Sequence, residues 1–219
     1  MKREKFFRIF FYVLGLLVLA FGITLNTKTN LGVSPIISVA YSVSTILDAN
    51  FGNVTLIWYI MFVFIEMVCH IYTKKYSILP ADILQIPLSI VFTRFMNVFA
   101  EIIPDMNGSV FIRILFLMAA IVFTGAGIGF TLNVRLIPNP GDGIVQVIAD
   151  CSKKKVGTVK NCFDTGCAII TVIISIIFAG KIIGIGIGTI LAVIGVGRVV
   201  AVFNYFWKEK ILSLSGIKA

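Results

Sequence analysis

The sequence has 219 residues, of which 58% are hydrophobic and 13% charged, and its mean hydropathy is +1.02. A soluble domain is typically about 45–50% apolar and about 25% charged, so the composition excludes a soluble globular protein and predicts an integral membrane protein. The net charge of +9 would suggest nucleic acid binding in a soluble protein. Here the basic residues fall in loops between apolar stretches, so they indicate membrane topology, and we expect no nucleic acid partner.

Six apolar stretches are each long enough to cross a bilayer core of about 30 Å as a helix. They cover approximately residues 6–25, 54–72, 79–103, 110–133, 162–180 and 182–206. The first follows a basic N-terminus, but its apolar run is too long for a signal peptide and no small-residue cleavage site follows. We therefore expect a retained helix and a single all-α membrane domain over residues 1–219.

The basic residues lie mostly on one side of these spans. With the N-terminus in the cytoplasm, 14 Lys and Arg residues are inside and three are outside (Lys28, Arg113 and Lys181). The inner set is Lys2, Arg3, Lys5, Arg8, Lys74, Lys75, Arg135, Lys153, Lys154, Lys155, Lys160, Lys208, Lys210 and Lys218. This imbalance predicts a plasma membrane protein with six crossings and both termini in the cytoplasm.

A short, hydroxyl-rich segment, residues 34–48, separates the first two spans. Ser34 suits a helix N-cap and Pro35 a first helical position, because proline lacks only an N–H that is unpaired there. The segment Asn139–Asp150 has the same opening, with Asn139, Pro140, Gly141 and Asp142. Half-length helices at membrane depth must be buried in protein or line a wet cavity, and their N-termini suit anionic groups. The alternative is a pair of interfacial helices that lie flat on the lipid surface.

The two halves of the chain resemble each other. Phe21–Asn26 corresponds to Ile128–Asn133 at an offset of 107, and Ser34–Pro35 to Asn139–Pro140 at 105. Phe51–Val54 corresponds to Val156–Val159 at 105, and Arg94 to Arg198 at 104. Three spans per copy would invert the second copy relative to the first, as in transporters built by duplication. The expected fold is two inverted three-helix repeats, about residues 6–103 and 110–206, each with a half-helix after its first span.

Arg94 and Arg198 fall within the third and sixth spans at matched positions. A charge at the membrane centre costs at least about 2.5–3.5 kcal/mol on insertion scales, so we consider both as contacts for a negatively charged solute. The alternatives are snorkelling to the headgroups and structural pairing with Asp82, Asp164 or Glu66. We include Asn26 and Asn133, which end the matched first spans, as further substrate contacts.

Four acidic residues are candidates for coupling to a proton or another cation: Glu66, Asp82, Asp142 and Asp164. Any of them could instead be an interface residue or a partner of an arginine. His70 has no second histidine or cysteine cluster near it, so we expect no metal site.

The motifs resemble those of YczE/YyaS/YitT-type bacterial membrane proteins over nearly the full chain. The matching residues are Leu31–Pro35, Phe51–Val54, Asn139–Gly143 and Gly184–Thr189. Ile36 and Ile37 stand where Trp-Asp is common in the first motif, so only the second copy keeps the acid, at Asp142. Little follows Trp207, which is similar to the short YczE-like branch. The resemblance implies a membrane fold in the bacterial plasma membrane.

The leading functional hypothesis is a small multi-pass permease for an anionic or zwitterionic solute. One alternative is a substrate-binding membrane subunit of a multi-component transporter, and another is a non-transporting regulator or scaffold. We expect no enzyme activity and no cofactor, because metalloprotease and hydrolase motifs are absent and one histidine leaves little acid–base chemistry. The expected partners are the lipid bilayer and a small-molecule solute, and the small size favours a homodimer.

Overall fold

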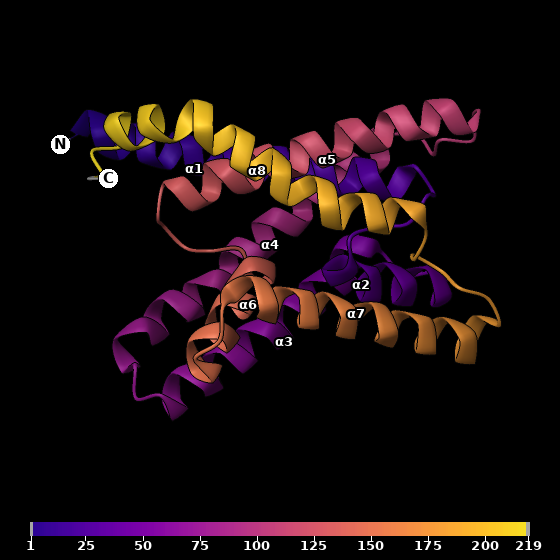
Figure 1. The fold of residues 1–219 in the computed structure, drawn as a ribbon, viewed down its shortest axis with the longest axis horizontal. Helices are drawn as coiled ribbons and strands as arrows, with labels where there is room; N and C mark the ends of the chain where they lie inside the picture. Colours follow the sequence, from indigo (N-terminus) through magenta and orange to yellow (C-terminus); the bar gives the residue numbers. More distant parts are fainter. Residues whose placement is uncertain (1, 218–219) are drawn as a thin grey trace. The chain divides into compact units, whose positions relative to one another are not determined.

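The computed structural model describes residues 2–217, and within that range the chain forms helices and no strand. The all-α prediction is confirmed, whereas Lys218 lies outside the described residues. The helices are α1 (Lys2–Lys28), α2 (Pro35–Ile46), α3 (Phe51–Tyr72), η1 (Tyr76–Ile78), α4 (Leu79–Ile102), α5 (Val110–Asn133), α6 (Pro140–Ser152), α7 (Val156–Ala179) and α8 (Ile187–Leu214) (Figure 1).

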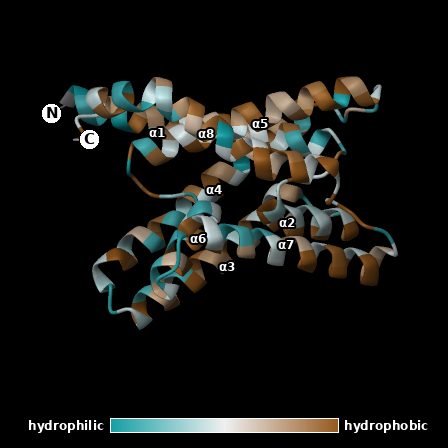
Figure 2. Ribbon diagram, in the orientation of Figure 1, coloured by the Kyte–Doolittle hydropathy of each residue, from teal (hydrophilic) through white to brown (hydrophobic). Residues whose placement is uncertain are grey.

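Six of these helices, α1, α3, α4, α5, α7 and α8, are long and apolar enough to cross a membrane, as predicted. Hydrophobic residues run along them, and hydrophilic residues gather at the N-terminus and around α6 (Figure 2). Three boundaries differ from the prediction by five residues or more, and one of them is the end of α8, at Leu214 rather than near residue 206. Helix α7 begins at Val156 rather than near residue 162, and α8 begins at Ile187 because Gly184 has a φ of 83° and interrupts the helical path.

The chain packs into two compact units, and each combines segments of both predicted repeats. The first unit contains the residues up to Val33, Val98–Leu136 and the residues from Gly186 onward. The second contains Ser34–Asn97 and Ile137–Ile185. The repeat boundaries and the single-domain assignment stay predictions.

In the first unit, α5 packs against both α1 and α8. Glycines on α5 allow this close approach, since a Cβ at Gly127 would lie 2.5 Å from the backbone nitrogen of Leu19, and a Cβ at Gly125 would meet Val199. Apolar clusters fill the remaining space, one around Leu25, Ile103 and Ala120 and another around Leu117, Ile121 and Ala192. Small residues at a helix interface favour tight packing in a membrane.

In the second unit, α2 packs on α7 and α3, and α6 packs on α3 and α7. With 12 residues α2 is about 18 Å long, too short to cross the hydrocarbon core. Eight of its residues are buried, as are seven of the 13 residues of α6, and the buried set includes most of the apolar residues of both helices. The short helices are therefore internal elements of this unit, which disfavours the interfacial alternative.

Candidate functional site

Polar residues form a continuous buried stripe on α3 and α4 of the second unit. On α3 the buried positions include Thr55, Tyr59, Glu66 and His70, and on α4 they include Asp82, Gln85, Ser89 and Thr93. Residues three or four positions apart share one face of a helix, so each series faces one way. Ionisable groups inside a membrane segment are rare and usually functional, which makes this stripe the candidate site.

Glu66 and Gln85 are joined across the two helices. The Gln85 Nε2 donates to Glu66 Oε2 over 2.6 Å, and both side chains are 1% exposed. Gly143 of α6 lies against the same carboxyl group, and a Cβ there would come within 2.8 Å of Glu66 Oε1. Three helices therefore meet at this carboxyl group, one of them the short helix α6.

His70 and Asp82 form a second buried contact on the same stripe. The His70 Nδ1 and Asp82 Oδ2 are 2.7 Å apart, and the two side chains are 7% and 3% exposed. Among the described residues, no group of three His, Cys, Asp or Glu side chains could hold a metal ion. Glu66 thus pairs with the neutral Gln85, and Asp82 pairs with the titratable His70. Neither acid pairs with Arg94 or Arg198.

The first half-helix, α2, is fixed to α7 by hydroxyl groups. Ser38 Oγ lies 2.7 Å from Thr171 Oγ1, and Ser42 Oγ lies 2.8 Å from Ser175 Oγ. All four side chains are buried with 0% exposure. Ser38 and Ser42 therefore form one buried seam, and its hydroxyls are paired to α7.

The predicted openings of both short helices lie in this unit. Ser34 and Asn139 occupy the N-cap positions, and Pro35 and Pro140 the first helical positions. Only Asn139 caps with its side chain, because its Oδ1 accepts from the Gly141 N–H over 3.1 Å, whereas the Ser34 side chain makes no cap bond. The first turn of α6 therefore has a side-chain cap that α2 lacks.

Asp142 lies in that first turn, outside the six long helices. Burial raises the pKa of Asp142 above its usual value, the Lys160 ammonium opposes this shift, and Asp164 adds to it. Lys160 Nζ lies 3.4 Å from Asp164 Oδ2, and the other oxygen, Asp164 Oδ1, is buried without a hydrogen-bond partner among the described residues. Two acidic side chains therefore lie beside α6: Glu66 of α3 and Asp164 of α7.

The two arginines are exposed side chains and lie in different units. Arg94 Nη2 donates to Asn53 Oδ1 over 2.6 Å, near the first turn of α3. The pairing partner is thus an amide rather than one of the three carboxylates considered from the sequence. No hydrogen bond or ion pair connects Arg198 to the rest of residues 2–217.

Asn26 and Asn133 are buried in the first unit and have different surroundings. Asn133 Nδ2 donates to Asn204 Oδ1 and to the Gly129 carbonyl, both over 2.7 Å. Asn26 Oδ1 is buried without a partner in the described part of the chain. Their assignment as substrate contacts remains a prediction.

The sequence analysis missed a reciprocal contact between α1 and α5 in the first unit. Arg8 donates to the carbonyls of Val134 (2.8 Å) and Arg135 (2.7 Å), and Arg113 donates to those of Thr29 (2.7 Å) and Asn30 (2.6 Å). The two contacts are related by one offset of 105 residues, which takes the donor Arg8 to Arg113 and the acceptors Thr29 and Asn30 to Val134 and Arg135. Each guanidinium group satisfies carbonyls left free where the other helix ends.

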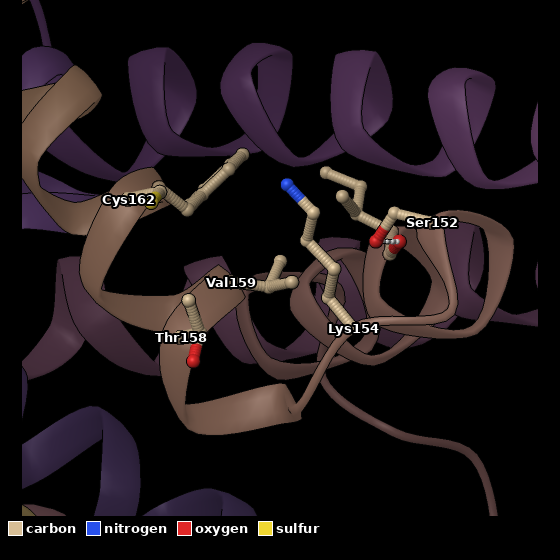
Figure 3. Close-up of a pocket in the computed structure, with 7 residues that line it drawn as sticks. Ser152, Lys154, Thr158, Val159 and Cys162 are labelled. Carbon is tan, nitrogen blue, oxygen red and sulfur yellow. Dashed lines mark hydrogen bonds between the residues drawn. The ribbon is translucent and has the colours of Figure 1, made fainter.

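A pocket of about 350 Å³ lies between α6 and α7. Its lining is Ile148, Ser152, Lys154, Thr158, Val159, Cys162 and Phe163, and the Lys154 side chain extends into it (Figure 3). None of the site residues predicted from the sequence lines this pocket. It opens beside the basic loop that precedes α7.

Comparison with known proteins agrees with this architecture. Residues 6–205 match DUF6198, a family of unknown function. The chain belongs to this family. It is 29% identical over 203 residues to the "Uncharacterized membrane protein YczE" of Bacillus subtilis (strain 168), covering 91% of this chain and 86% of that protein. It is 26% identical over 204 residues to the "Uncharacterized protein YyaS" of the same organism, covering 93% and 95%. No solved structure matches.

The predicted resemblance to YczE and YyaS is therefore confirmed, and this DUF6198 member is a multi-pass membrane protein. The matched region includes every residue of the buried stripe and both short helices.

Proposed function

We propose that this protein is a small multi-pass permease of the plasma membrane, with both termini in the cytoplasm, that moves a small anionic or zwitterionic solute. The observation that carries the proposal is the interior of the second unit. There, two buried half-helices meet the hydroxyls and carboxyls of longer helices. Such groups are expensive to keep inside a membrane protein, and short helices around a polar interior are typical of transporters.

Equivalent positions in the second unit support the inverted repeat as part of this proposal. The buried faces of α3 and α7 correspond at an offset of 105, with Tyr59, Phe62, Glu66 and His70 on one and Asp164, Cys167, Thr171 and Ser175 on the other. The packing also corresponds, because α2 contacts α7 and α3 while α6 contacts α3 and α7. The reciprocal arginine contacts of α1 and α5 follow the same offset.

The two equivalent faces differ in chemistry. The α7 face is joined to α2 by paired neutral hydroxyls, whereas the α3 face presents Glu66 and His70 toward α4 and α6. In such a duplicated protein the hydroxyl contacts of α2 with α7 would be fixed, and the equivalent positions of α3 would carry the titratable Glu66 and His70. In this proposal Glu66, Asp82, Asp142 and Asp164 provide coupling, and Arg94 and Arg198 contact the solute.

Transport is tested by reconstituting the protein into liposomes and screening labelled amino acids, carboxylates and phosphorylated solutes for uptake against empty liposomes. We expect at least one class to accumulate, with about tenfold or greater loss in Asp142→Asn, because a half-buried charge in the first turn of α6 is removed. Lys181→Gln, at an exposed position, is the control.

Folded protein that transports none of these classes would contradict the permease assignment. A solute that raises the unfolding temperature without being taken up would instead indicate a binding subunit. Unchanged uptake by both Arg94→Gln and Arg198→Gln would remove the arginines from the site and leave the rest of the proposal standing.

A further inference from the structure

Glu66 and Gln85 leave two oxygen atoms without partners in the interior of the second unit. The hydrogen bond between the two side chains uses Gln85 Nε2 and Glu66 Oε2. Glu66 Oε1 and Gln85 Oε1 are both buried, and neither has a hydrogen-bond partner among residues 2–217. Buried polar atoms are rarely unpaired, so two such atoms on one pair of side chains call for a ligand.

The charges around Glu66 do not compensate an ionised carboxylate. On its own helix, His70 is bonded to Asp82 and Cys69 is a neutral thiol. On α4, Asp82 adds negative charge, and on α6 Asp142 precedes Gly143, which contacts the carboxyl. No Lys or Arg forms an ion pair with Glu66 in the described part of the chain. An unpaired buried carboxylate is costly, so uptake of a cation at Glu66 is favoured.

We propose that Glu66 and Gln85 form a proton-binding site. The carboxylate accepts one proton on Oε1 and becomes a neutral carboxylic acid. The new Oε1–H donates to Gln85 Oε1 while Gln85 Nε2 continues to donate to Glu66 Oε2. A single proton thereby provides both missing hydrogen bonds and removes the buried charge, and no other reactant is required.

Gly143 makes room for this site. The equivalent contact in the other half of the unit, at the same offset of 105, is Ser38 against Thr171, two small side chains joined by a hydrogen bond. At α3 the longer Glu66 takes the place of threonine, and Gly143 takes the place of serine. A Cβ at Gly143 would lie 2.8 Å and 3.1 Å from the two carboxyl oxygens of Glu66. The absence of a side chain at Gly143 therefore allows α6 to pack in direct contact with this carboxyl group.

Protonation would therefore change the charge against the first turn of α6. A helix N-terminus interacts favourably with negative charge. The ionised Glu66 therefore attracts the N-terminus of α6, and this attraction is lost when Glu66 is protonated. The use of this change for coupling rests on the proposed function, whereas proton binding itself does not depend on transport.

The test is an infrared titration of the purified protein in lipid between about pH 4 and pH 10, without any solute. We expect a carboxylic acid carbonyl band whose intensity falls as the pH rises. Glu66→Gln should lack one component of this band and keep those of the other acidic side chains, so the Glu66 site is given by the difference between the wild-type and Glu66→Gln spectra. The glutamine is isosteric and neutral, so this variant should fold. Glu101→Gln, at an exposed position, should keep the Glu66 component of the band.

Two further variants report on the geometry. Gln85→Met removes both the donor to Glu66 Oε2 and the acceptor for the new Oε1–H, so the carbonyl band of the protonated Glu66 should move to higher frequency. Gly143→Ala should shift the midpoint by about one pH unit, because the carboxyl must move. Gly166→Ala is the matched control, since a Cβ there meets nothing within 4 Å.

A spectrum of Glu66→Gln identical to that of the wild type over the whole range would overturn the proposal. A wild-type band that disappears when sodium is added at constant pH would assign the site to a metal cation and would also overturn it. If the titration behaves as expected while no solute is transported, the proton site stands and the permease assignment fails.

Discussion

The buried contact of His70 with Asp82 is a residue-scale feature that can be tested by stability. We expect Asp82→Ala to lower the free energy of unfolding by about 1–3 kcal/mol, because the buried imidazole loses its partner. Asp105→Ala is the matched control. It removes a carboxylate that is 62% exposed and pairs with Lys28, so the loss should stay below about 1 kcal/mol.

Thermal unfolding in detergent, followed by intrinsic fluorescence, measures both variants. Equal losses for Asp82→Ala and Asp105→Ala would contradict a structural role for the buried contact.

The residues of this stripe were only partly predictable from the sequence. The sequence analysis identified Glu66 and Asp82 because acids are rare in apolar spans. It left their partners open, since Gln85 is uncharged and His70 was considered only as a metal ligand. The spacing of Glu66 and His70 by four positions, and of Asp82 and Gln85 by three, places each pair on one helix face. That spacing could have indicated a shared seam, but which helices face each other depends on tertiary packing.

At the scale of the elements, Arg8 and Arg113 connect α1 and α5 at opposite ends of the helix pair. Each guanidinium makes two hydrogen bonds to carbonyls beyond the end of the other helix. We expect Arg8→Gln and Arg113→Gln each to lower the free energy of unfolding by about 1–3 kcal/mol. The double variant should lose nearly the sum, because sites without shared partners are usually additive.

Lys5→Gln, an exposed change on the same helix as Arg8, should have little effect on unfolding in detergent. If Arg8→Gln behaves like Lys5→Gln while Arg113→Gln is destabilising, the two contacts are not equivalent.

The sequence predicted the helical elements more reliably than their contacts. Proline after a capping residue located the starts of α2 and α6 at Pro35 and Pro140, because proline suits a first helical position. Ile182–Gly186 was assigned to the sixth span because this stretch is apolar. Apolar composition does not reveal the positive φ of Gly184, so the late start of α8 was missed. The roles of Arg8 and Arg113 were missed because both were counted only as topology charges.

At the scale of the whole molecule, the charge distribution and the six long helices together imply an even number of crossings. If α5 crosses the membrane once, the loop before α5 and the loop before α7 lie on opposite sides of the membrane. The basic loop at Lys153–Lys155 would be cytoplasmic and the acidic loop around Asp105 external. This topology follows from loop charge and span count alone, so it can be tested without knowing the solute.

We expect single cysteines to report this topology in a variant whose four native cysteines are replaced by serine or alanine. A membrane-impermeant maleimide should label Asn107→Cys in intact cells. It should label Lys154→Cys and Lys210→Cys only after the membrane is permeabilised, because an odd number of crossings separates each position from Asn107. The reverse result for all three would invert the orientation and leave the repeat intact. Labelling of Lys154→Cys and Lys210→Cys from different sides would be incompatible with six crossings, and the antiparallel relation of the two halves would fail with it.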